Sequence, residues 1–96
     1  MHLAVCRLTL HIYASQSLKD KRRVVQSVSE KLRHRYGVSV TEVGGLDTWQ
    51  TAVLGLAAVS GAATKAREII DRAVAYVQEI APEAEVTSAE VDEFDY

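Results

Sequence analysis

The chain has 96 residues, of which 48% are hydrophobic and 25% are charged, and its formal net charge is −2. This length fits one domain, and the composition is typical of a folded protein rather than a disordered one. The single cysteine, Cys6, excludes an internal disulfide and a cysteine-ligated iron–sulfur cluster. The sequence shows no signal peptide and no apolar run near the ~18 residues of a membrane span, so we expect a cytoplasmic protein with no membrane contact.

The first segment, residues 2–13, has the two-residue period of a β-strand. Its apolar side carries Cys6, Leu8, Leu10 and Ile12, and its other side carries Val5, Arg7, Thr9 and His11. We expect the apolar side to lie in the core. Cys6 is therefore expected to be a buried structural thiol rather than a nucleophile.

Residues 17–36 are predicted to form one amphipathic helix. Ser17 is placed as its N-cap, Asp20 completes a capping box, and Gly37 is a stop signal. The apolar stripe is Leu18, Val25, Val28 and Leu32, with Val24 on its flank, and the opposite face carries Lys19, Arg22, Arg23, Gln26, Arg33 and His34.

Positive charge is concentrated in this helix, which contains seven of the 11 Lys and Arg residues of the chain, and no Lys or Arg follows Arg72. A solvated helix face, a surface for nucleic-acid phosphates and a surface for an acidic protein are all compatible with this pattern. For the phosphate surface we expect the contacts to come from Lys19, Arg22, Arg23 and Arg33, with Lys21 and Arg35 assisting from the flanks. The helix N-terminus near residues 15–17 could hold a further phosphate.

The remaining segments predict a strand over residues 37–43, a turn over 44–47, a strand over 49–60, a helix over 63–80 and a strand over 85–91. Residues 92–96 are expected to be a short acidic tail. The order βαββαβ with right-handed crossovers gives a four-stranded antiparallel sheet with both helices on one face. We therefore predict a single ferredoxin-like α+β domain over residues 1–96.

The sheet face away from the helices is predicted to be open and largely apolar. Val53, Ala57 and Val59 would lie there near Val5. An apolar face of this kind needs cover, so we expect a homodimer through it.

No catalytic or metal-binding constellation is visible, and we expect neither an enzyme nor a cofactor. His2, His11 and His34 match no standard metal-ligand spacing. An RNA-recognition motif would need aromatic rings on its central strands, whereas residues 54–58 read LGLAA. If RNA is bound, the helix should contact phosphates rather than the sheet contacting bases.

Two long segments, CRLTLHI and SLKDKRRVVQSVSEKLRHRYGVSVTEVGGLDTWQTAVLG, resemble the YlxP-like family, which is also classed as a domain of unknown function. The most specific parts are residues 17–23, residues 38–43, and Asp47 with Trp49 and Gln50. The resemblance implies a ferredoxin-like fold and no established activity. The family's genes often lie beside those for translation initiation factor 2 and ribosome-binding factor A, which implies ribosomal RNA or a ribosomal subunit as the partner.

An alternative reading is a protein-interaction or homo-oligomerisation module. Trp49 is the only tryptophan, and it either packs in the core or serves as an exposed anchor for a partner protein. In the second case Asp47, Trp49 and Gln50 would form the partner-binding loop together with the open sheet face.

Overall fold

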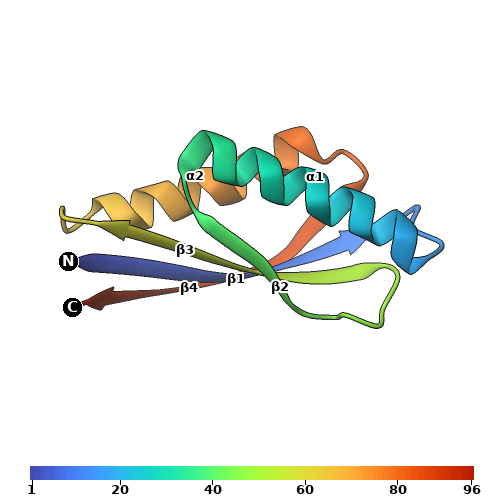
Figure 1. The fold of residues 1–96 in the computed structure, drawn as a ribbon, viewed down its shortest axis with the longest axis horizontal. Coiled ribbons are helices and arrows are strands. Elements are labelled where there is room, and N and C mark those ends of the chain that lie inside the picture. The colour runs from blue at the N-terminus through green and yellow to red at the C-terminus, as the bar shows by residue number, and fades with distance from the viewer.

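A computed structural model describes all 96 residues as one layer of helices on one layer of sheet (Figure 1). The elements are β1 (His2–Ile12), α1 (Leu18–Tyr36), β2 (Ser39–Gly44), β3 (Thr51–Ser60), α2 (Lys65–Ile80) and β4 (Ala84–Asp95). The strand order is β2-β3-β1-β4, and every neighbouring pair is antiparallel. The predicted ferredoxin-like α+β arrangement, with both helices on one face, is confirmed.

The core lies between the sheet and the two helices and contains 18 buried apolar residues. The predicted alternation of β1 is confirmed, because Cys6, Leu8, Leu10 and Ile12 are all buried. Leu54 of β3 and Leu32 of α1 meet them in the interior. Each fully buried leucine contributes about 1.5–3 kcal/mol of hydrophobic free energy, so this layer supplies most of the favourable packing term.

The ends of α1 are set by local chemistry. The Ser17 hydroxyl oxygen accepts a hydrogen bond of 3.1 Å from the Asp20 N–H, as the predicted N-cap requires. The Asp20 carboxylate in turn accepts a bond of 3.1 Å from the Gln16 N–H. At the other end Gly37 adopts a left-handed conformation with φ of 66°, and its N–H donates to the Arg33 carbonyl.

The prediction that residues 92–96 form an acidic tail is wrong, because β4 continues through residue 95 and pairs with the whole length of β1. The register joins His2 to Asp95, and the two chain ends exchange hydrogen bonds between Met1 and Tyr96. Without these residues the segment of β1 from His2 to Val5 would have unpaired backbone groups on that side. Because β4 is an edge strand, its acidic side chains stay in water while its backbone pairs.

Candidate nucleic-acid interface

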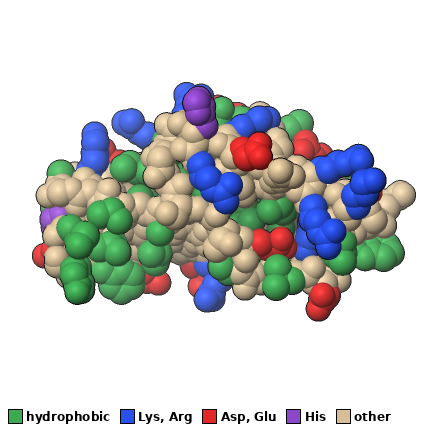
Figure 2. All heavy atoms as spheres, in the orientation of Figure 1, with side chains coloured by type: hydrophobic (Ala, Val, Ile, Leu, Met, Phe, Trp, Pro, Cys, Tyr) green, Lys and Arg blue, Asp and Glu red, His purple; other side chains and the backbone are tan.

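The outer face of α1 is cationic and accessible. Lys19, Arg22, Arg23, Lys31, Arg33 and Arg35 are all exposed. None of these six side chains forms an ion pair with a carboxylate, whereas pairs do occur on α2, where Arg67 contacts Asp71 and Glu93. Figure 2 shows Lys and Arg side chains gathered at the end of the molecule where α1 begins.

The topology explains why these cations lack partners. Seven of the 13 acidic residues lie after residue 78, mostly on β4. β4 is at the opposite edge of the sheet from β2, and α1 packs on the β2 side (Figure 1). The acidic and basic segments are therefore kept on opposite sides of the molecule, which gives it a strong charge asymmetry despite a small net charge.

Two arginines of this face are held in place by neutral groups. The Arg33 guanidinium donates a hydrogen bond of 2.6 Å to the Val40 carbonyl on the free edge of β2. The Arg35 guanidinium lies 4.3 Å from the centre of the Tyr76 ring, and interaction with the Tyr76 side chain raises the pKa of Arg35. Both contacts order the side chains without neutralising their charge.

A shallow groove of about 320 Å³ runs between α1 and the edge of β2. Arg22 and Arg33 line its helix side, and Thr41 and Glu42 line its strand side. Arg22 and Arg33 are separated by three helical turns, so they lie along the same side of α1.

Lys21 does not belong to this surface, and its assignment as a phosphate contact is corrected. Its side chain is only 2% exposed. The ammonium nitrogen lies 2.6 Å from the Gly45 carbonyl oxygen, 3.3 Å from that of Thr51 and 3.4 Å from that of Leu46. One carboxylate oxygen of Glu42 lies 3.0 Å away and supplies the countercharge. These acceptors occupy the ammonium, so a polyanion cannot reach it.

The helix N-terminus is also unavailable to a phosphate. The Asp20 carboxylate already accepts from the Gln16 N–H at this end, and the Ser17 hydroxyl occupies a second donor. A bound phosphate would lie beside a negative charge. The expectation of an anion site near residues 15–17 is therefore not supported by this geometry.

The loop between β2 and β3 carries the predicted partner-binding residues. Trp49 is 54% exposed and Leu46 is 59% exposed, so the tryptophan is not part of the core. Asp47 is exposed as well. Gln50 is also exposed, and its amide donates to the carbonyl oxygens of Tyr13 and Ser15 at 3.2 and 3.3 Å.

Other potential chemistry is limited. Cys6 is buried as predicted, and burial raises the pKa of its thiol. No three His, Cys, Asp or Glu side chains come close enough together to bind a metal ion. Neither helix has the length and apolar character to cross a bilayer.

These features define a ferredoxin-like domain whose first helix presents an exposed cationic face. The chain belongs to the family described as "Protein of unknown function (DUF503)", which matches residues 3–91. It is also 34% identical, over 83 residues, to the "Uncharacterized protein YlxP" of Bacillus subtilis strain 168, covering 86% of this chain and 89% of that protein. The family resemblance read from the sequence motifs is confirmed.

The burial of Lys21 makes a direct stability prediction. Lys21→Met should lower the free energy of unfolding by about 3–5 kcal/mol, because it leaves the Glu42 carboxylate without its buried partner. Lys19→Met is the matched control and should change stability by less than about 0.5 kcal/mol, because Lys19 is exposed. Urea unfolding measures both. Equal effects of the two substitutions would contradict the structural role of Lys21.

Proposed function

We propose that this protein is a small non-enzymatic factor that binds RNA, most specifically ribosomal RNA, through the outer face of α1. The observation that carries the proposal is that Lys19, Arg22 and Arg23 are exposed and have no carboxylate partner. Clustered free cations of this kind release counterions from a nucleic-acid backbone, which is the main source of its binding free energy.

The geometry of α1 fits a phosphate backbone. The rise of a helix places Arg22 and Arg33 roughly 16 Å apart along its axis. That span, with Lys19 and Arg23 on neighbouring turns, lets the face contact about two to five phosphates. Because such contacts do not read base identity, the surface would position RNA rather than specify a sequence.

The sheet gives no support for base recognition. At the centre of its open face the two middle strands present Arg7, Thr9, Val53, Gly55 and Ala57, none of which is aromatic. Base stacking by the sheet would require rings at such positions. The proposal is therefore restricted to the helix face.

The charge asymmetry would also orient an approaching RNA relative to the protein. The net charge of −2 gives no general attraction to a polyanion, and the acidic β4 edge repels one. An approaching RNA would therefore be steered toward α1, so binding depends on one surface and is lost when that surface changes.

The proposal predicts that RNA binding weakens as the salt concentration rises. Anisotropy titrations with a fluorescein-labelled single-stranded oligouridine should show log K falling linearly with log[salt], with a slope of about −1.4 to −3.5, because two to five phosphates each release counterions. A titration that is flat between low and moderate salt would reject the proposal.

The proposal also predicts that the protein associates with ribosomal subunits in cell lysate. On a sucrose gradient of cell lysate the wild-type protein should travel with ribosomal subunits, and the double substitution Arg22→Glu with Arg23→Glu should return it to the top fractions. The matched control is Lys65→Glu with Arg72→Glu, which changes the charge of α2 by the same amount at exposed positions. The proposal fails if both doubles stay with the subunits, or if both leave them.

A second candidate function is docking of a partner protein on the loop between β2 and β3. It is favoured by the exposure of Trp49 and Leu46. The loop that carries them is fixed by hydrogen bonds from the buried Lys21 ammonium to the carbonyl oxygens of Gly45 and Leu46. Exposed tryptophan in a well-ordered setting is a common anchor at protein interfaces.

The same gradient separates the two candidates. Trp49→Ala should leave the subunit association unchanged if α1 is the binding surface. If Trp49→Ala abolishes the association while the double substitution on α1 has no effect, the loop is the functional surface and the RNA proposal is wrong.

A further inference from the structure

The open face of the sheet is not covered by any part of the chain (Figure 1). Its side chains form rows across the four strands, because the strand registers align them. One row, from β2 to β4, is Thr41, Gly55, Arg7 and Glu90, and the next row is Ser39, Ala57, Val5 and Asp92. Toward the chain ends, Val59, Leu3 and Phe94 continue the pattern.

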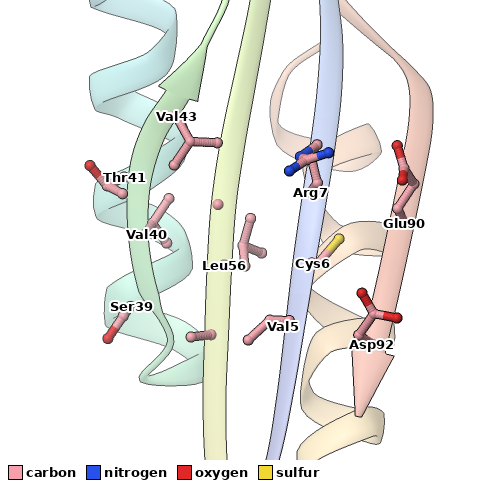
Figure 3. A pocket seen from close by; sticks show the side chains of 12 residues that line it. Val5, Cys6, Arg7, Ser39, Val40, Thr41, Val43, Leu56, Glu90 and Asp92 are labelled. Carbon is pink, nitrogen blue, oxygen red and sulfur yellow. The ribbon is translucent and has the colours of Figure 1, made fainter.

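The centre of this face is hollowed. Gly55 has no side chain, and the hollow around it has a volume of about 500 Å³ and is lined by residues of all four strands (Figure 3). A Cβ on Gly55 would lie only 3.0 Å from a methyl group of Val43, so this position is kept small by its neighbour. Arg7, one of the longest side chains on the face, is the direct cross-strand partner of Gly55.

We propose that a second copy of this chain covers the open face, related by a two-fold axis that runs along the strands between β1 and β3. Under this rotation the β2-to-β4 order of each row in one copy runs opposite to that in the other copy. Therefore β1 of one copy lies over β3 of the other, and β2 lies over β4. Arg7 of each copy is then placed over the hollow at Gly55 of the other copy. The long Arg7 side chain of each copy therefore meets the hollow of the other, twice, at the centre of the interface.

The other positions of the two rows are complementary under the same operation. The hydroxyl of Thr41 faces the Glu90 carboxylate of the second copy, and Ser39 faces Asp92, so a donor meets an acceptor at each edge. An axis perpendicular to the strands through the central row would instead place Arg7 against Arg7. The charge pattern therefore favours the axis along the strands.

Apolar contact completes the match. Val5 faces Ala57 of the second copy, and Leu3 faces Val59, which is 60% exposed in the single chain. Figure 2 shows hydrophobic side chains gathered at the end where both termini lie. Covering these residues removes apolar surface from water, which is the main driving force for association.

The size of the face is close to that of a standard dimer interface. The molecule measures 42 × 21 × 18 Å, so a long face of 42 × 18 Å offers roughly 750 Å². A standard stable interface buries about 800 Å² on each partner. The dimer uses no residue of the outer face of α1, so it goes beyond the proposed RNA binding and does not depend on it.

Sedimentation equilibrium tests the association. The wild-type chain should have twice its monomer mass of 10.5 kDa. Arg7→Ala should raise the dissociation constant roughly 10- to 100-fold, because it removes the central projection. Arg23→Ala removes an exposed arginine on α1 and should leave the dimer intact. A wild-type monomer at millimolar concentration, or an Arg7→Ala dimer as tight as the wild type, would overturn the proposal.

A crosslinking experiment tests the axis itself. Ser39→Cys and Asp92→Cys are both exposed positions, and within one chain they lie three strand spacings, ~14 Å, apart. A mixture of the two variants should form covalent dimers with a short bis-maleimide, whereas each variant alone should not. The native Cys6 is buried and should not react. Crosslinks within either single variant, or none in the mixture, would show a different arrangement.

Discussion

The buried ammonium of Lys21 is the interaction on which the arrangement of this domain depends. It ties the first turn of α1 to the loop after β2 and to the start of β3, where it meets carbonyl oxygens of Gly45, Leu46 and Thr51. The Glu42 carboxylate balances its charge. In a low-dielectric interior each of these groups would be costly without its partner, so this contact stabilises the helix and the loop against each other.

The same interaction divides the cations of α1 into two kinds. Lys21 is part of the interior, whereas Lys19, Arg22 and Arg23 on the adjacent positions remain in water without carboxylate partners. The domain thus concentrates free positive charge on a rigid element instead of carrying a large net charge. Because the backbone of α1 is already ordered, little backbone freedom would be lost in the proposed contact with an extended polyanion.

Much of the fold was predictable because its signals are local. The alternation in β1, the Ser17 cap and the Gly37 stop involve residues close in sequence. Lys21 was missed although its position was readable: it lies three residues after Leu18 and seven before Val28, inside the apolar stripe. Its burial depends on acceptors more than 20 residues away, which helical periodicity does not reveal. The strand character of residues 92–95 was missed for the same reason, because it depends on pairing with β1 at the far end of the chain.

The most direct test of the account is an amide NMR titration of the folded protein with a short single-stranded RNA, with the lysine ammonium signals observed in parallel. We predict progressive shifts on the outer face of α1 around Arg22 and Arg23, while the Lys21 ammonium resonance stays unchanged and protected from exchange. Shifts confined to the sheet or to the Trp49 loop, or a Lys21 ammonium that exchanges freely and responds to RNA, would contradict it.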